Sequence, residues 1–188
     1  MKLALTILRT IVGALFFGHG TQKLYGWFGG HGPEATAQMF ENGLGLRPGK
    51  RHATAAGAAE AGGGAMLALG MFTPAAAASL IGVMATAIEK VHFKNGPWAT
   101  NGGYEYNLVL IAALLALCDA GPGDLSFDHI AGTEVKGPLV ALLALGAGVG
   151  GAAFVTRIAN EAPPVENVAP GDPAAAPAAS VPADTPVA

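Results

Sequence analysis

Long runs of apolar residues constrain this chain more than any other feature of its sequence. Hydrophobic residues make up 52% of the 188 positions and charged residues only 12%, whereas soluble domains carry roughly 25% charged residues. The hydrocarbon core of a bilayer is about 30 Å thick, and about 20 apolar residues in a helix cross it. The sequence therefore predicts an all-α integral membrane protein.

Five apolar segments are long enough, or nearly so, to cross a bilayer. They are residues 3–24, 53–71, 74–88, 103–120 and 138–155. The second and third belong to one block that is too long for a single crossing. Thr73-Pro74 divides this block, because proline disfavours helix in the residue before it. We therefore expect a four-helix bundle with a fifth, C-terminal transmembrane helix.

The first apolar segment could instead be a cleaved secretory signal. Arg9 interrupts what would be its hydrophobic region, and no small-x-small cleavage site precedes the polar residues Thr21, Gln22 and Lys23. We therefore expect this segment to be retained as a helix.

The expected organisation of the chain follows from these runs. Residues 1–128 form the four-helix bundle, 129–137 a polar linker, 138–156 the fifth transmembrane helix, and 157–188 a disordered tail rich in alanine and proline. Gly146 and Gly150 have the GxxxG spacing that permits close helix contact. A general abundance of glycine and alanine would produce the same spacing.

Charge and cysteine content exclude some classes of function. The formal net charge is −3, so the chain offers no basic surface for phosphates and nucleic-acid binding is not expected. Cys118 is the only cysteine, so a disulfide, a CxxC redox pair or a cysteine zinc cluster cannot form within this chain alone.

Antiparallel crossings would gather polar side chains at one end of the bundle. We call the end where the first helix begins side A and the opposite end side B. The 1.5 Å rise per residue places Glu60 about 12 Å from the side-B face. The candidate residues for a pocket near side B are His19, Gln22, Lys23, Glu60, His92, Tyr104 and Glu105.

Glu60 is the strongest of these candidates, because it is an ionisable residue within a predicted spanning helix. An ionisable side chain within a spanning helix costs about 2.5 to 3.5 kcal/mol and usually faces the bundle interior or a water-filled cavity. The glycines at positions 62–64 leave space for a neighbouring helix, water or a ligand. The alternative is a structural carboxylate that pairs with His19, Gln22 or Lys23.

Arg9 is expected to have a structural role. It lies about 9 Å from side A, and an axial gap of about 9 Å separates it from Glu60 in a 30 Å core. An ion pair would need a long reach, so we expect the guanidinium to extend toward side A.

His19 and His92 could carry protons or bind a metal, because imidazole titrates near neutral pH and coordinates most first-row metals. Together with Glu60 or Glu105 they would form a 2-His-1-carboxylate set. No HxxxH or HExxH spacing supports such a set, so no metal site is expected.

Aromatic and basic residues mark the expected interface on side B. Tyr25, Trp27, Phe28 and Trp98 are interpreted as an interfacial aromatic belt. Side B also carries most of the lysine and arginine residues, so the positive-inside rule places it in the cytoplasm. Lys2 and Arg9, at the start of the first helix, favour the opposite orientation.

Four blocks of the sequence resemble the DoxX family of small membrane proteins over about residues 3–128. They are RTIVGALFFGHGTQKLYGWFGG, EAGGGAMLALGMFTP, ATAIEKVHFKNGPW, and NGGYEYNL followed by GPGDLSFD. The positions that match the family pattern are Arg9, His19, Gly20, Gln22, Lys23, Glu60, Gly63, Gly64, His92, Gly102, Gly103, Glu105 and Tyr106. Those expected to be structural, together with Gly62, are Arg9, Gly63, Gly64, Gly102 and Gly103.

The resemblance implies a four-helix membrane bundle in the cell membrane and a link to redox or sulfur metabolism. Some relatives are implicated as a subunit of a thiosulfate:quinone oxidoreductase, and others in a complex with a sulfurtransferase and superoxide dismutase. A quinone is therefore the implied ligand, and these two proteins are the implied partners besides the lipid bilayer. The fifth segment and the tail depart from the family pattern.

Two classes of function fit these residues. The first is a membrane component of a redox or oxidative-stress system, which as an enzyme would be a quinone- or thiosulfate-linked oxidoreductase subunit. The second is a non-enzymatic membrane scaffold or a small-molecule carrier or transporter. One fold hosts many chemistries, so the choice must be argued from the site.

Overall fold

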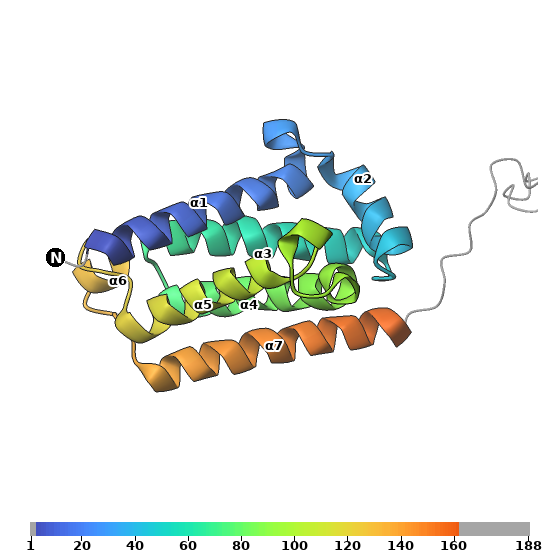
Figure 1. Cartoon of the computed structure of the whole chain (residues 1–188). Helices are drawn as coiled ribbons and strands as arrows, with labels where there is room; N and C mark the ends of the chain where they lie inside the picture. The colour runs from blue at the N-terminus through green and yellow to red at the C-terminus, as the bar shows by residue number, and fades with distance from the viewer. Residues whose placement is uncertain (1–2, 162–188) are drawn as a thin grey trace, which may run out of the picture.

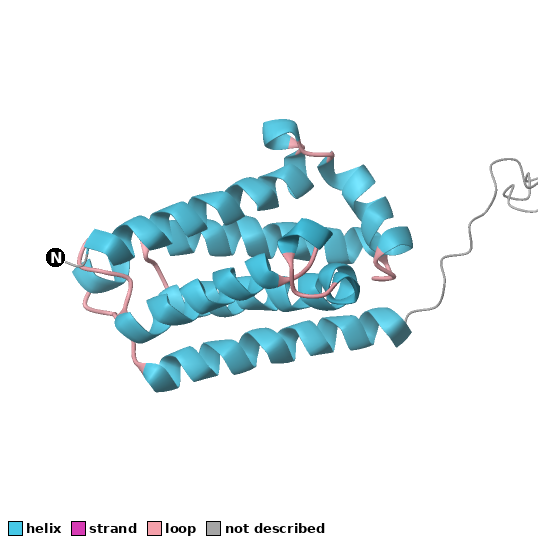
Figure 2. Cartoon of the chain, in the orientation of Figure 1, coloured by secondary structure: helices cyan, strands magenta, loops and turns pink. Residues whose placement is uncertain are grey.

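The computed structural model describes residues 3–161, and every regular element in that part of the chain is a helix (Figure 2). The seven α-helices of these residues are α1 (Leu3–Tyr25), α2 (Gly32–Gln38), α3 (Gly49–Leu69), α4 (Thr73–Ala87), α5 (Glu105–Ala120), α6 (Phe127–Ile130) and α7 (Pro138–Glu161). Short helical turns extend some of them, including η2 (Met39–Gly43) after α2 and η3 (Ile88–His92) after α4. The predicted all-α class is confirmed.

The long helices α1, α3, α4, α5 and α7 lie side by side along one direction (Figure 1). The N-terminus and α6 mark side A, on the left of the figure, whereas α2 and the end of α7 mark side B. Helices α1, α4 and α7 run from side A to side B, and α3 and α5 return (Figure 1). This alternation agrees with the antiparallel order expected from the sequence.

Within residues 3–161, three helices are long and apolar enough to cross a bilayer. They are Leu3–Tyr25, the continuous helical stretch Thr73–Asn95, and Pro138–Glu161. Helices α3 and α5 were also predicted as crossings but are not among these three. With its 16 residues, α5 is only about 24 Å long at 1.5 Å per residue.

Two pairs of glycines bring α1 and α3 together at backbone distance. A Cβ atom on Gly13 would lie 2.6 Å from the carbonyl oxygen of Gly64, and one on Gly20 would lie 2.6 Å from that of Gly57. In each helix the two glycines are seven residues apart, which keeps them on one face. This close approach sets the distance that side chains of α1 must cover to reach α3.

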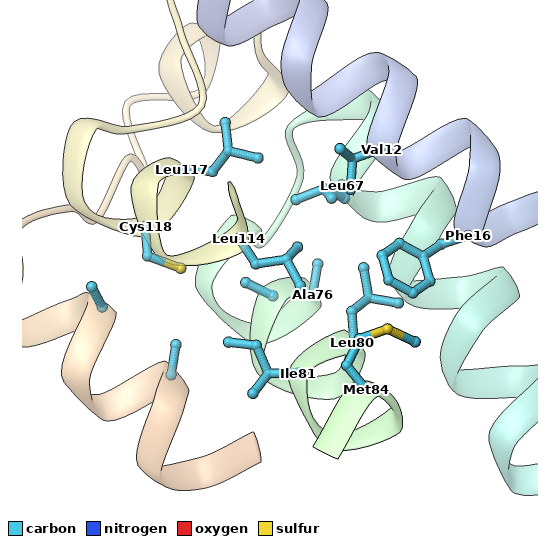
Figure 3. Packing of buried hydrophobic residues seen from close by; sticks show 13 residues of the cluster. Val12, Phe16, Leu67, Ala76, Leu80, Ile81, Met84, Leu114, Leu117 and Cys118 are labelled. Carbon is cyan, nitrogen blue, oxygen red and sulfur yellow. The ribbon is translucent and has the colours of Figure 1, made fainter. Parts of the chain in front are cut away.

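The main apolar core is built around α4 and α5 (Figure 3). Leu80 and Ile81 of α4 and Leu114 and Leu117 of α5 are fully buried. Phe16 of α1 packs into the same cluster. The core therefore joins all the long helices between side A and the middle of the bundle.

A second, smaller apolar cluster lies at side B. Phe40 and Leu46, from the segment between α2 and α3, pack against Ala53 of α3 and Ala159 of α7. The sequence predicted no element in this segment, whose apolar residues are too few for a membrane crossing. The cluster ties the end of α7 to the start of α3.

Helix α7 is longer than the predicted segment 138–156. Ala159 in its last turn is buried in the side-B cluster, and on the exposed face Arg157 pairs with Glu161 at 3.1 Å, one turn further along, an interaction that adds little stability. The prediction of a disordered tail over 157–188 was therefore wrong for residues 157–161. Residues 162–188 lie outside the described residues.

The glycines of α7 do not pack as the GxxxG spacing suggested. A Cβ atom on Gly146 or Gly150 would meet no atom within 4 Å, whereas one on Gly148 would lie 2.7 Å from the carbonyl oxygen of Ala78 in α4. Gly148 is thus the residue that lets α7 approach α4.

Glu134 holds the expected polar linker in place at side A. Its carboxylate accepts a hydrogen bond from Lys136 Nζ at 2.9 Å and lies 2.9 Å from His129 Nδ1. The bonds to His129 and Lys136 lower the pKa of Glu134, so this carboxylate stays ionised to a more acidic pH than usual. The linker begins inside α6, which ends at Ile130.

Candidate functional site

Glu60 forms an ion pair with Lys23 inside the bundle. Lys23 lies in the last turn of α1, and its Nζ is 2.5 Å from Oε2 of Glu60 in α3. The Glu60 side chain is only 5% exposed and that of Lys23 is 23% exposed. Of the partners considered for Glu60 from the sequence, the structure shows Lys23. A buried carboxylate needs such a partner because an isolated charge is costly to bury.

A cavity of about 170 Å³ lies beside this pair, and we call it the polar cavity. Its polar lining residues are His19, Lys23, Glu60, His92, Tyr106 and Asn107. At about 30 Å³ per molecule, it has room for about five waters. Four of the seven predicted pocket residues, contributed by α1, α3 and η3, therefore share one cavity.

Asn107 completes the polar cavity from α5; the sequence placed it at side B but it was not among the seven pocket candidates. It is only 6% exposed, and its Nδ2 donates a 3.4 Å hydrogen bond to Met84 Sδ. A thioether is a weak acceptor, so the carboxamide keeps most of its capacity for a bound molecule. Tyr106, which matched the family pattern but was not among the pocket candidates, also lines the cavity.

The two histidines of the polar cavity are held in the same way. Nδ1 of His19 lies 3.1 Å from Gln22 Oε1, and Nδ1 of His92 lies 2.7 Å from the Gly102 carbonyl oxygen. These oxygens only accept hydrogen bonds, so each Nδ1 carries a proton. Nε2 is then the proton acceptor of each neutral ring.

The three remaining pocket candidates surround the polar cavity without lining it. Gln22 contacts His19 from a shallow outer groove between α1 and α3. Glu105 accepts a 2.7 Å hydrogen bond from the Ala99 backbone N–H, and Tyr104 stacks on Phe93. Glu105 and Tyr104 therefore hold the segment between η3 and α5 in place.

The predicted structural glycines have different environments. Gly102 has φ +75°, and a Cβ atom on Gly103 would lie 2.7 Å from the Trp98 carbonyl oxygen, so both shape the loop that holds His92. Gly63 and Gly64 leave space for α4 and α1, respectively, whereas a Cβ atom on Gly62 would meet nothing within 4 Å. Gly62 is therefore not a packing residue.

The ion pair also lines a larger cavity of about 470 Å³, which we call the apolar cavity. It shares Lys23, Glu60, Met84 and Ala87 with the polar cavity. Its walls come from η2, α3, α4 and α7. The Lys23–Glu60 pair thus lines both a small polar space and a larger apolar one.

Arg9 fills a different site, at side A. It is 3% exposed, and its guanidinium donates hydrogen bonds to four backbone carbonyls: those of Leu67 and Ala68 near the end of α3, and those of Pro122 and Leu125 in the loop after α5. The positive charge lies near the C-terminal end of α3, where it interacts favourably with the negative end of the helix dipole. Arg9 therefore does extend toward side A, but it binds carbonyls there and is not exposed to solvent.

Asp128 caps the start of α4 next to this arginine. Its carboxylate accepts hydrogen bonds from the backbone N–H groups of Phe72 and Thr73, at 2.8 and 2.9 Å, and from the Thr73 hydroxyl at 2.8 Å. Anionic groups stabilise a helix N-terminus. Arg9 and Asp128 together hold the side-A loops to the ends of α3 and α4.

A metal site in a protein usually needs at least three His, Cys, Asp or Glu side chains close together. Among residues 3–161, no group of three or more His, Cys, Asp or Glu side chains is arranged to hold a metal ion.

Residues 4–93 match the sequence model of the DoxX family. The chain carries a DoxX family domain. The DoxX domain comprises α1 to η3 and contains His19, Lys23, Glu60 and His92. The α5 residues of the polar cavity and the α7 wall of the apolar cavity lie outside the matched residues. Comparisons with curated proteins and with solved structures gave no match.

The DoxX domain and the three long apolar helices identify a multi-pass membrane protein. The predicted resemblance to the DoxX family is confirmed over residues 4–93, and the predicted location in a membrane is confirmed.

Proposed function

We propose that this protein is the membrane component of a redox system, and that its polar cavity binds the reacting group of a quinone or of a small sulfur species. The observation that supports this most directly is that His19, Lys23, Glu60 and His92 line one cavity. Lys23 can donate a hydrogen bond to a bound oxygen atom. Glu60 and the two Nε2 atoms can transfer protons, since carboxylates and imidazoles are common acid–base groups.

A quinone needs two electrons and two protons to become a hydroquinone. The polar cavity would supply the protons through Glu60 and the histidines. A lone cysteine cannot form a dithiol, so we assign the electrons to a partner protein or to a bound cofactor. The sulfurtransferase and superoxide dismutase implied by the family resemblance are the partners to test by co-purification.

We also propose that α3 and α5 cross the membrane, which gives five crossings. Both helices lie alongside α1 and α4 (Figure 1), and the glycine contacts join α1 and α3 at backbone distance. In this arrangement α7 ends at side B, together with Lys23 and His92. The excess of basic residues on that side supports a cytoplasmic side B.

Replacing Glu60 with glutamine tests the redox proposal. The amide keeps the shape of the side chain but cannot transfer a proton, so we expect quinone reduction in membranes to fall about 100-fold, as is typical when a general acid or base is lost. Quinone binding should be retained. The matched control is Glu89→Gln, at a half-exposed residue near side B that pairs with Lys90, and it should reduce quinone at the wild-type rate.

Two results would overturn the redox proposal together. They are the absence of quinone binding by the purified protein and unchanged quinone reduction in membranes from a deletion strain. A non-enzymatic scaffold or carrier is then the better account. That account expects Glu60→Gln and His92→Ala to leave oxidant tolerance intact, while variants that disturb helix packing abolish recovery of partner proteins.

A further inference from the structure

The volumes of the two cavities beside the Lys23–Glu60 pair limit the size of the ligand group that each can hold. Sites for small molecules are usually about 300–1,000 Å³. The polar cavity, at about 170 Å³, is smaller than this and has room for a head group only. The apolar cavity, at about 470 Å³, lies within the range. A ligand that reaches both would have a small polar head and a larger apolar part.

The apolar cavity is a gap between α3 and α7 over the surface of α4. Helix α7 packs along α4, where Gly148 allows the close approach. At side B the gap is closed by the cluster that contains Phe40, Leu46 and Ala159. Gly151, about two helical turns before Ala159, lines this cavity, and a Cβ atom there would meet nothing within 4 Å. Small residues on α7 thus keep the space open.

Apart from Lys23 and Glu60, the polar side chains that line the apolar cavity are hydrogen-bonded to backbone carbonyl oxygens. Ser79 and Thr86 donate to carbonyls one turn earlier in α4, and His52 Nε2 lies 2.9 Å from the Arg47 carbonyl oxygen. The Lys23–Glu60 pair is therefore where a ligand in this cavity would find its polar contact.

The pair itself favours a neutral head group. An anion would compete with Glu60 for Lys23 and would lie next to a carboxylate in a buried place, where repulsion between like charges is strong. A neutral carbonyl oxygen can accept a hydrogen bond from the Lys23 ammonium, which has three donors, without displacing Glu60.

We propose that the apolar cavity holds the hydrocarbon chain of a neutral, lipid-soluble ligand whose polar ring lies at the Lys23–Glu60 pair. Helix α7, outside the matched DoxX residues, forms the wall that accommodates the chain. This inference rests on the proposed function and narrows its substrate to the lipid-soluble quinone class, in preference to small sulfur anions.

Binding to the purified full-length protein in nanodiscs tests this inference, with empty nanodiscs subtracted. The three probes are a benzoquinone with a decyl chain, the same ring without the chain, and decylphenol. The decyl quinone should bind at least about 10-fold more tightly than the bare ring, because each buried CH₂ group of the chain adds to the free energy of binding. Gly151→Leu should remove this advantage and leave binding of the bare ring unchanged.

Gly150→Leu is the matched control. Gly150 is the preceding residue, does not line the apolar cavity, and has nothing within 4 Å of its Cβ position, so this variant should bind all three probes like the wild type.

The outcomes separate the inference from the proposed function. If the decyl quinone and the bare ring bind equally well, or if Gly151→Leu has no effect on the decyl quinone, the chain site is refuted while quinone binding stands. If decylphenol binds and Gly151→Leu weakens it, but neither quinone binds, the chain site is supported and the quinone function is refuted. If no probe binds, both are refuted.

Discussion

Replacing Gly64 with leucine will leave little folded protein in the membrane. A Cβ atom on Gly64 would lie 2.6 Å from the carbonyl oxygen of Gly13 in α1, and a backbone atom cannot rotate away as a side chain can. Added bulk in a packed core costs about 1–3 kcal/mol where neighbours can adjust, so we expect a loss of about 3 kcal/mol or more here. The yield of monodisperse protein after detergent extraction, by size-exclusion chromatography, measures this.

Gly62→Leu provides the control for this experiment within the same glycine run. Gly62 is exposed, and its Cβ position meets nothing within 4 Å. The variant should therefore be extracted like the wild type. Equal yields of the Gly62→Leu and Gly64→Leu proteins would show that α1 and α3 do not approach each other at backbone distance.

Replacing Arg9 with methionine will also destabilise the protein strongly. The variant keeps an apolar side chain of similar length but removes the Arg9 donor from the carbonyls of Ala68, Pro122 and Leu125, whereas the Leu67 carbonyl still accepts the Gly70 backbone N–H. Hydrogen bonds to charged groups contribute roughly 1.5–3 kcal/mol each, so we expect a loss of about 5 kcal/mol. Thermal unfolding in detergent will show this as a lower midpoint or as failure to fold.

Two further variants test whether the loss of stability comes from the hydrogen bonds of Arg9. Arg157→Met removes an arginine whose side chain is 80% exposed and should have little effect. Arg9→Lys keeps the positive charge but not the planar fork that reaches several acceptors, so its stability should lie between those of the wild type and Arg9→Met. If Arg9→Met unfolds at the wild-type temperature, Arg9 is not the residue that joins the side-A loops.

The sequence predicted the long helices well because their signal is the length of an apolar run. Helix α1 begins and ends within one residue of the predicted segment 3–24, and α4 begins at the predicted Thr73-Pro74 division. The short helix α2 and the extra turn of α7 were not predicted. Ala37 of α2 packs against the side-B cluster and Ala159 of α7 belongs to it, and no local pattern reveals such packing between distant residues.

The candidate site was predicted in part, for a related reason. The rise per residue gives the depth of a side chain along a helix, and this was enough to place His19, Glu60 and His92 toward the same end of the bundle. Depth does not give rotation about the helix axis. Helix α5 is apolar on nearly all sides, so its sequence did not show that Asn107 faces the cavity while Glu105 faces the loop.

The central claim is that residues from separate helices meet in one cavity at side B, and intramolecular cross-linking tests it most directly. In a Cys118→Ser background, His19→Cys and His92→Cys are combined in one chain and treated with a short bifunctional thiol reagent. We expect mass spectrometry to show the two positions linked within single chains. A second pair, His19→Cys with Leu125→Cys at side A, should remain unlinked. Absence of the first link, with both thiols shown to be reactive, would contradict the account.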